Sequence, residues 1–307
     1  MQVESIAAID IGSNAIRLLI NNVEDFDAKK AVKKNAYIRV PVRLGEDVFQ
    51  SGRIGEDKIG RLMETMRAFV HLMHVFNVNG YRACATSAMR EAANGAEVVK
   101  LVKEKAGLDI DLVTGPEEAD LIYAAGSLDE VMDKDKSYLH VDVGGGSTEL
   151  VVYCDHKKKD AFSFPIGTLR ELAEAVNPAT RDELKKTLKL IYERYAPVDI
   201  IASGGNINKT LKLLGKRDGE AVDYNSVENF YRILAKLSIE ERLEKYKMNS
   251  YRADVIVPAL DIFLTIGAAC KVKNYIIPKV GLVDGIIRML YSGQMKPRKT
   301  PDKKGYC

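Results

Sequence analysis

Two segments of this 307-residue sequence share one pattern, although they lie far apart in the chain. Ile6–Ile20 and Tyr138–Val152 each contain an apolar run, an aspartate, an apolar residue, a glycine-rich turn and a second apolar run. The runs are short, rich in β-branched residues and bounded by glycine, which favours strands over helices. A hairpin that recurs in this way predicts two similar domains, each opening with the repeated unit.

The rest of the chain alternates between short apolar runs and longer amphipathic stretches. Glu56–Phe76 carries its apolar residues on one helical face, and Pro116 stands where proline favours the start of a helix. This alternation predicts an α/β fold in two halves, and the hairpins make both sheets mixed rather than parallel. The expected domains are residues 1–125 and 126–295, with a ligand cleft between them and a basic, flexible tail at 296–307.

Several shorter elements complete this expectation. Ala36–Val42 is expected as the third strand of the first domain, and Ala161–Pro165 as a strand of the second. Between the second hairpin and that strand, Asp155–Asp160 is expected as a turn, with its three lysines in solvent. Leu282–Tyr291 is expected as the last helix.

The charges of the chain nearly cancel. Lys and Arg number 46 and Asp and Glu 43, which gives a formal net charge of +3. A general nucleic-acid binder is far more basic, although this balance permits a local basic site for a polyanion. No stretch reaches about 18 consecutive apolar residues, and no basic segment followed by an apolar run opens the chain. We therefore expect a cytoplasmic protein without a transmembrane helix.

The turns of the repeated hairpin combine glycine with small polar residues, as Gly12–Asn14 in the first copy and Gly144–Thr148 in the second. Glycine lets backbone N–H groups approach an anion, and the polar side chains add neutral donors. The preceding aspartates, Asp10 and Asp142, suit a divalent cation that bridges to phosphate, or the positioning of water. Ordinary hairpin turns need the same residue types, so it is the matched pair of copies that favours an anion site.

Two other phosphate-binding motifs are excluded. Gly215–Lys216 is followed by arginine and lacks the upstream glycine of a P-loop. The triple glycine Gly144–Gly146 departs from the spacing of a dinucleotide fingerprint, and it lies between two expected strands rather than before a helix.

Five segments, taken together, resemble the exopolyphosphatase and guanosine pentaphosphate phosphohydrolase family, within the superfamily of actin, hexokinase and Hsp70. They follow the order of that family and are highly specific as a set. The resemblance implies two actin-like (ribonuclease H-like) domains with mixed sheets flanked by helices. The segments are Asp10–Asn14 with Arg17, Ala85–Arg90, Gly115–Ala119, Asp142–Glu149 and Ser203–Gly205.

The sequence departs from the family pattern at three points. Ala15 replaces a serine in the first loop, which removes one hydroxyl, and Val283-Asp284 stands where the family often has Arg-Glu. Longer relatives carry a C-terminal helical extension for which this chain has no room. The resemblance therefore implies the short, two-domain form, which argues against long-chain processivity.

Phosphoanhydride hydrolysis requires that the negative charge of the transferring phosphoryl group is neutralised. It also requires a water molecule in line with the bond that breaks, and a base that accepts the proton of this water. Glu118 lies in the first turns of the helix that Pro116 begins, where the helix dipole favours an ionised carboxylate beside an anion site. The resemblance places the catalytic glutamate at this same residue, with Glu117 as the alternative. An ordinary acidic first turn would explain both glutamates equally well.

The remaining predicted site residues fall into three groups. Asp142 and Glu149 are the expected catalytic or water-orienting carboxylates, and with Asp10 they are candidate metal ligands. Arg43 is a further candidate phosphate clamp. The predicted phosphate-binding residues are Gly12, Ser13, Asn14, Arg17, Arg90, Gly144, Gly145, Gly146, Ser147 and Thr148.

The resemblance implies a phosphohydrolase that releases terminal phosphate from inorganic polyphosphate with the support of Mg²⁺. Guanosine pentaphosphate (pppGpp) is the alternative substrate. Two rival hypotheses are an ATP-dependent sugar or acetate kinase on the same fold and a non-catalytic nucleotide sensor. The carboxylate pair after Gly115-Pro116 and the lack of an evident sugar-binding motif argue against the kinase. Polyphosphate or (p)ppGpp is thus the expected partner, nucleic acid and membranes are not, and a homodimer is left open.

Overall fold

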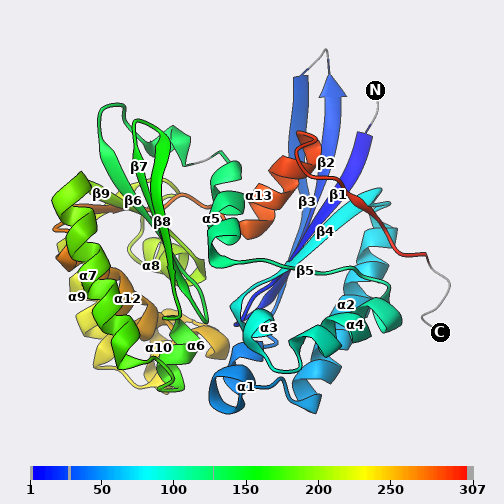
Figure 1. Ribbon diagram of the computed structural model, residues 1–307, viewed down its shortest axis with the longest axis horizontal. Coiled ribbons are helices and arrows are strands. Elements are labelled where there is room, and N and C mark those ends of the chain that lie inside the picture. Colours follow the sequence, from blue (N-terminus) through cyan, green and yellow to red (C-terminus); the bar gives the residue numbers. More distant parts are fainter. Residues whose placement is uncertain (1–2, 27–28, 127, 303–307) are drawn as a thin grey trace. The chain divides into compact units, whose positions relative to one another are not determined.

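The computed structural model describes residues 3–26, 29–126 and 128–302. It divides into two compact units (Figure 1). Unit 1 comprises residues 1–125 together with 282–307, and unit 2 comprises residues 126–281. The chain therefore leaves unit 1 once, forms unit 2 and returns to complete unit 1.

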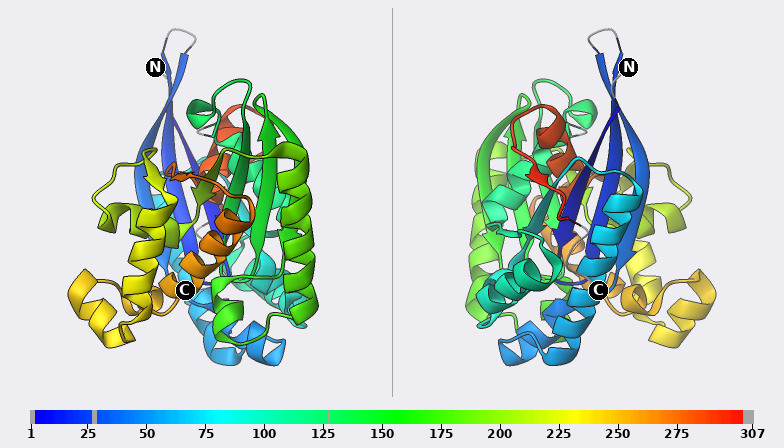
Figure 2. Two further views of the ribbon diagram at one scale, coloured as in Figure 1. Left: turned by 90° about the vertical axis from the view of Figure 1, so that its left-hand side faces the viewer. Right: turned by 90° about the vertical axis from the view of Figure 1, so that its right-hand side faces the viewer.

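The sheet of unit 1 is mixed, as predicted. A long antiparallel meander of β1, β2 and β3 is extended on the β1 side by β4 and β5, which run parallel to β1, and by β12, which is antiparallel to β4. Figure 2 shows the twist of the long strands. β1 and β2 are buried over most of their length, which explains their continuous apolar runs. The strand order is β12-β4-β1-β2-β3 with β5 beside β4. The bounds are β1 (Val3–Ile11), β2 (Ile16–Phe26), β3 (Lys29–Val40), β4 (Gly80–Ala85), β5 (Asp111–Leu112) and β12 (Arg298–Lys299).

Helices cover the sheet of unit 1. α13 packs against β1, β2 and α5, while α2 packs against α4 on the other side of the sheet in Figure 1. The apolar residues expected on one face of the 56–76 helix are accordingly buried, among them Leu62, Met66 and Met73. The helices are α1 (Leu44–Ser51), α2 (Glu56–Val75), α3 (Ser87–Glu91), α4 (Gly95–Ala106), α5 (Gly115–Ala124) and α13 (Leu282–Tyr291).

The sheet of unit 2 repeats this plan. Its hairpin of β6 and β7 continues into β8, and β9 and β11 run parallel to β6 on the other side. The strand order is β10-β11-β9-β6-β7-β8. The bounds are β6 (Ser137–Val143), β7 (Thr148–Cys154), β8 (Lys157–Phe164), β9 (Asp199–Ser203), β10 (Ala221–Asp223) and β11 (Asn274–Ile276).

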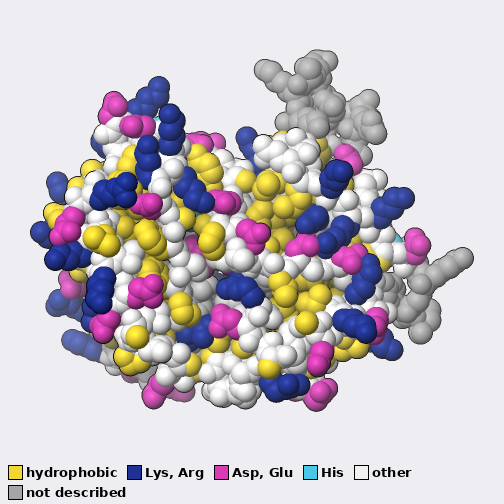
Figure 3. All heavy atoms as spheres, in the orientation of Figure 1, with side chains coloured by type: hydrophobic (Ala, Val, Ile, Leu, Met, Phe, Trp, Pro, Cys, Tyr) yellow, Lys and Arg dark blue, Asp and Glu magenta, His cyan; other side chains and the backbone are white. Residues whose placement is uncertain are grey.

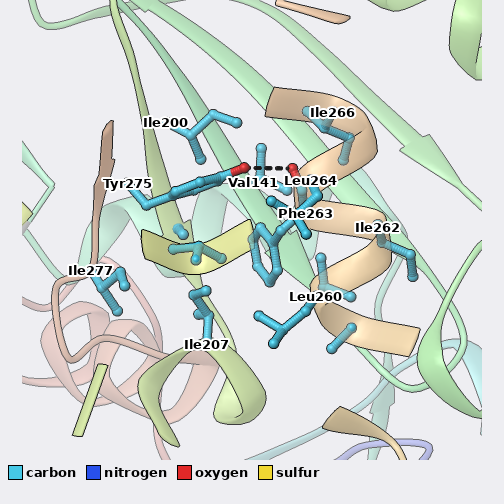
Figure 4. Packing of buried hydrophobic residues seen from close by; sticks show 14 of the residues in the cluster. Val141, Ile200, Ile207, Leu260, Ile262, Phe263, Leu264, Ile266, Tyr275 and Ile277 are labelled. Atoms are coloured by element: carbon cyan, nitrogen blue, oxygen red, sulfur yellow. Dashed lines mark hydrogen bonds between the residues drawn. The ribbon is translucent and has the colours of Figure 1, made fainter. Parts of the chain in front are cut away.

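The core of unit 2 is built around α12, the most apolar helix of the unit. Phe263 and Leu260 of α12 face Ile200 of β9 and Tyr275 of β11 across the core (Figure 4). The hydroxyl of buried Tyr275 donates to the carbonyl of Phe263 at 2.9 Å, which satisfies a polar group that burial would otherwise penalise. The helices are η1 (Asp129–Val131), α6 (Thr168–Leu172), α7 (Pro178–Tyr195), α8 (Gly205–Leu213), α9 (Tyr224–Ala235), α10 (Ile239–Tyr246), α11 (Ser250–Ala253) and α12 (Ile256–Ala269).

The C-terminal part of the chain differs from the sequence expectation in two ways. α13, expected in the second domain, belongs to unit 1 because it packs on β1, β2 and α5. The expected tail at 296–307 is not loose where it is described, since Arg298 pairs with Tyr81 of β4 and donates to Asp111 at 2.5 Å. The hydroxyl of Thr300 donates to the carbonyl of Val78 at 2.7 Å. Residues 303–307 lie outside the described part of the chain.

The turn after β7 is shorter than predicted. Asp155 and His156 alone form it, both with positive φ, and β8 already begins at Lys157. The three lysines therefore lie in a strand, although they are exposed as expected. β8 is an edge strand, and lysine is common on edges because it prevents pairing with another chain.

The surface carries both charge signs in mixture. On the face shown in Figure 3, basic and acidic side chains alternate, in keeping with the small net charge. Within the described residues, none of the helices has the length and apolar character that crossing a bilayer requires.

Candidate active site

Three predicted site segments of unit 1 lie at one edge of its sheet. β1, β4 and β5 are parallel, with Ile11 beside Ala85 and Ala85 beside Leu112, so their carboxyl ends are aligned. The segments that follow them are the first glycine-containing loop, α3 and α5. In open α/β sheets this edge is the usual place for ligands.

Loop 1, residues Gly12–Ala15, is held by its carbonyl groups. The Gly12 N–H donates to the Ala15 carbonyl at 3.2 Å and closes the turn. The carbonyls of Ser13 and Asn14 accept from Gly45 at 2.9 Å and Arg43 at 3.1 Å, at the start of α1. Because N–H and C=O point in opposite directions in a trans peptide, the following N–H groups face away from α1.

Loop 1 is also tied to α3. The Ser13 hydroxyl lies 2.8 Å from that of Ser87 and accepts from the Ala88 N–H at 3.2 Å. Ser13 is buried, and its hydroxyl is thus an anchor within the unit. The predicted phosphate contacts of Gly12, Ser13 and Asn14 stay predictions.

The charge of Asp10 is balanced within its own hairpin. Asp10 and Arg17 are opposite each other on β1 and β2, and the guanidinium donates to the carboxylate. Asp10 is buried, so this ion pair compensates the cost of removing the carboxylate from water. The Arg17 guanidinium thus holds the Asp10 carboxylate in place. The phosphate contact of Arg17 and the metal role of Asp10 stay predictions.

The two glutamates of α5 have different surroundings. Thr114 and Glu117 form a capping box: the Glu117 carboxylate accepts from the Thr114 N–H at 2.7 Å and from its hydroxyl at 2.8 Å. These hydrogen bonds hold the pKa of Glu117 below its usual value. Glu118 is half-buried and its side chain is outside the capping box. The capping box therefore contains Glu117 and not Glu118, and the catalytic role of Glu118 stays a prediction.

Arg90 joins two segments of the same edge. It lies in the last turn of α3, and its guanidinium donates to the carbonyl of Val113, just before the cap of α5. This contact places a cation beside the N-terminal end of α5. The predicted phosphate-clamp role of Arg90 stays a prediction.

Loop 2, residues Gly144–Ser147, repeats the anchoring of loop 1 in unit 2. The Gly144 N–H donates to the Ser147 carbonyl at 2.9 Å. The carbonyls of Gly144 and Gly145 accept from Thr168 at 3.0 Å and Leu169 at 2.8 Å, in the first turn of α6. Loop 2 thus occupies the otherwise unpaired N–H groups of that helix end.

Arg170 and Gly167 complete the anchoring of loop 2. The buried Arg170 donates from Nε to the Gly146 carbonyl at 2.8 Å. A Cβ on Gly167 would lie 2.5 Å from backbone atoms of Gly146, so only glycine permits this approach. With three successive carbonyls directed at α6 and Arg170, the N–H groups of Gly145, Gly146 and Ser147 face away from α6. Loop 2 is therefore preorganised to present donors to an anion.

Two acidic residues lie side by side in the middle of the unit 2 sheet. Asp142 of β6 and Glu149 of β7 are directly opposite each other, and carboxylate oxygens of the two lie within 4.8 Å. Glu149 is almost fully buried, with 1% of its surface exposed. Like charges at such a cross-strand position are destabilising, so a cation between them would be favoured. Oxygen ligands of this kind suit a hard divalent cation such as Mg²⁺.

A serine flanks each of these acids on the next strand. Ser203 of β9 is in register with Asp142 and donates to its Oδ1 at 2.7 Å. Ser163 of β8 is in register with Glu149 and donates to its Oε1 at 3.1 Å. The four side chains form one row across four strands. Sequence reasoning missed both serine roles, because they depend on strand pairing.

The comparisons with known proteins agree with this arrangement. The model of the Ppx/GppA phosphatase family matches residues 29–292. The chain belongs to the Ppx/GppA phosphatase family. Over 204 residues it is 30% identical to exopolyphosphatase 2 of Mycobacterium tuberculosis, a match that covers 64% of this chain and 63% of that protein. The match thus spans less than two thirds of that relative's length.

Solved structures of family members have the same fold. The Aquifex aeolicus Ppx/GppA enzyme is 26% identical with a TM-score of 0.73, covering 94% of this chain and 99% of that one. An exopolyphosphatase from Cytophaga hutchinsonii is 21% identical with a TM-score of 0.82, covering 94% and 98%. The prediction of an actin-like α/β fold with two mixed sheets flanked by helices is confirmed.

Proposed function

We propose that this family member is an exopolyphosphatase, which releases terminal phosphate from inorganic polyphosphate by attack of water. The observation that carries the proposal is the Asp142–Glu149 pair beside the preorganised amides of loop 2. Such a site offers donors for phosphoryl oxygens and carboxylates for a cation or water, which are the needs of phosphoanhydride hydrolysis. The name of the Mycobacterium tuberculosis relative supports the same substrate.

In this proposal, the N–H groups of loops 1 and 2 are the donors to phosphoryl oxygens, and Arg90 and Arg17 are the cations for neighbouring phosphates. Glu118, whose side chain is outside the capping box, accepts the proton of the attacking water. The proton goes to the glutamate while the terminal bridging P–O bond breaks, so that orthophosphate and a chain shorter by one unit are released.

Asp142 and Glu149 would hold Mg²⁺, which when bound neutralises charge on the phosphoryl oxygens. Asp10, already paired with Arg17, is the weaker of the three predicted ligands. The chain's own contribution is to fix the two carboxylates in register, with a serine donor on each.

The 5′-phosphate of pppGpp is the alternative substrate, because the family includes enzymes for it and its terminal phosphoanhydride is the same bond. The cytoplasmic location expected from the sequence belongs to the same proposal. A kinase is a less favoured hypothesis, because it would need a site for a second substrate. A non-catalytic sensor is also less favoured, because it would need no general base.

Phosphate release decides between these hypotheses. The purified chain is incubated with polyphosphates of several lengths, pppGpp and ATP, each with EDTA and with added Mg²⁺. We expect release from polyphosphate, with Mg²⁺ and not with EDTA. Preferential release from pppGpp would assign the alternative substrate, and no release from any of them would contradict the proposed hydrolase.

A further inference from the structure

A chain of hydrogen bonds runs from Asp142 into the core of unit 2. Ser203 donates to Asp142 Oδ1 at 2.7 Å, and behind it His140 Nε2 lies 3.0 Å from the Ser203 oxygen. His140 and Ser203 each have 0% of their surface exposed. His140 is two residues before Asp142 on β6, so both side chains are on the same face of the sheet.

The directions of these hydrogen bonds follow from the groups involved. A carboxylate only accepts, so the single hydroxyl proton of Ser203 goes to Asp142. The Ser203 oxygen must then accept from His140, which places the imidazole proton on Nε2. Among the described residues, Nδ1 of His140 has no hydrogen-bond partner, so Ser203 is the histidine's only polar contact there.

We propose that Ser203 and His140 are positioning residues that fix the rotamer of Asp142 for cation binding. The inference rests on the proposed function, since it assigns a task to a carboxylate of that site. His140 prevents the Ser203 hydroxyl from turning away, and Ser203 in turn prevents the rotation of Asp142. Burying a polar imidazole in an apolar core costs free energy of folding. The orientation of the Ser203 hydroxyl explains why a histidine is present there.

The two acids of the site differ in this support. Glu149 receives its serine donor from Ser163, which is exposed on the edge strand β8, whereas the donor to Asp142 is fully buried and backed by a second group. Of the two serine donors, the one to Asp142 is therefore the buried one. Ser163→Ala, which removes the exposed donor, is the matched comparison for Ser203→Ala.

The test measures Mn²⁺ binding to the full chain by electron paramagnetic resonance, without substrate, alongside urea unfolding and kcat. Ser203→Ala removes the donor to Asp142 and also leaves the buried His140 N–H without a partner. We expect Mn²⁺ affinity to fall about tenfold or more, as for loss of a hydrogen bond to a charged group, and stability to fall as well. Ser163→Ala should change the affinity less.

The double variant His140→Leu/Ser203→Ala separates positioning from packing. Leucine removes the unpaired donor, so stability should return toward that of the wild type while Mn²⁺ affinity and kcat stay low. His140→Gln, which can still donate to Ser203, should keep the affinity of the wild type. Recovery of Mn²⁺ affinity together with stability in the double variant would overturn the proposal, as would a wild type that binds no Mn²⁺. If Mn²⁺ binding behaves as expected but no substrate is cleaved, the proposed function fails and the positioning role stands.

Discussion

At the scale of single residues, Glu117 and Glu118 show how neighbours in one helical turn divide two tasks. Glu117 closes the capping box with Thr114, whereas the Glu118 side chain is outside it. Adjacent helical residues point about 100° apart, so both cannot face the same ligand. The position of Glu118 after the parallel strand β5 puts it at the edge where ligands bind in α/β sheets.

The first prediction tests this division. Glu118→Gln keeps the size of the side chain but removes the base, so kcat should fall about 10²- to 10⁴-fold while polyphosphate affinity stays level or rises. Glu117→Gln is the matched control, because glutamine also serves in a capping box and activity should change little. Steady-state kinetics and direct binding measure both. A collapse of kcat in Glu117→Gln, with Glu118→Gln active, would move the role one residue back.

Gly167 is the residue on which the conformation of loop 2 depends most directly. A Cβ at this position would lie 2.5 Å from the Gly146 backbone, and backbone cannot give way as a flexible side chain can. Gly167→Ala should therefore displace loop 2 and lower kcat/KM for polyphosphate about tenfold or more, in line with the loss of preorganised donors. Kinetics and thermal unfolding together test this. Unchanged kcat/KM would mean that the loop 2 amides do not hold the substrate.

At the scale of elements, the contact of α13 with α5 is unusually close. A Cβ on Gly285 of α13 would lie 1.6 Å from the carbonyl oxygen of Leu121 in α5. The two helices can approach so closely only because that side chain is absent. The glycine at position 285 is thus explained by helix packing.

The third prediction compares two glycine substitutions in helices. Gly285→Ala should force α13 away from α5 and cost about 1–3 kcal/mol, the usual range for overpacking. Gly60→Ala, at an exposed position of α2 where a Cβ meets nothing within 4 Å, should instead stabilise by about 0.5–1 kcal/mol. Urea unfolding measures both. Equal effects of the two substitutions would show that the close contact with Leu121 is not needed.

Elements with a clear hydrophobic period could be predicted from the sequence, whereas the full extent of the edge strands could not. α2 begins at Glu56 and α13 spans Leu282–Tyr291, as their apolar periods predict. β3 begins at Lys29, well before the expected Ala36, and β12 contains Arg298 and Lys299. Edge strands need less apolar content because one side faces solvent, so local pattern alone does not reveal them.

The same limit applies to the candidate site. The positions of the two loops and of Asp142 and Glu149 follow from the repeated hairpin, since one hairpin sets its own register. The roles of Ser203, His140 and Arg170 depend on pairing between segments distant in the chain. The sequence does contain a histidine within an apolar strand and an arginine shortly after Gly167. Without the strand order, however, the residues that they contact could not be identified.

At the scale of the whole molecule, unit 1 is discontinuous and unit 2 is not. Residues 1–125 supply most of unit 1, but α13 and β12 come from the end of the chain. Leu282, Ile286 and Leu290 of α13 are buried there. Unit 2 has a continuous sequence and its own core, centred on α12 and β9. The two units should therefore differ in their ability to fold alone.

The last prediction follows from this asymmetry. A fragment of residues 126–281 should unfold cooperatively in urea, because it contains its complete sheet and core. A fragment of residues 1–125 should not, because without α13 the apolar surfaces of β1, β2 and α5 that this helix covers are exposed to water. Joining residue 125 to residue 282 by a glycine-rich linker, with the chain continued to 302, should restore cooperative unfolding. Circular dichroism with urea measures all three proteins, and Gly285→Ala in the linked protein should lower its midpoint again. Cooperative unfolding of 1–125 alone, at the same midpoint as the linked protein, would show that the returning segment does not stabilise unit 1.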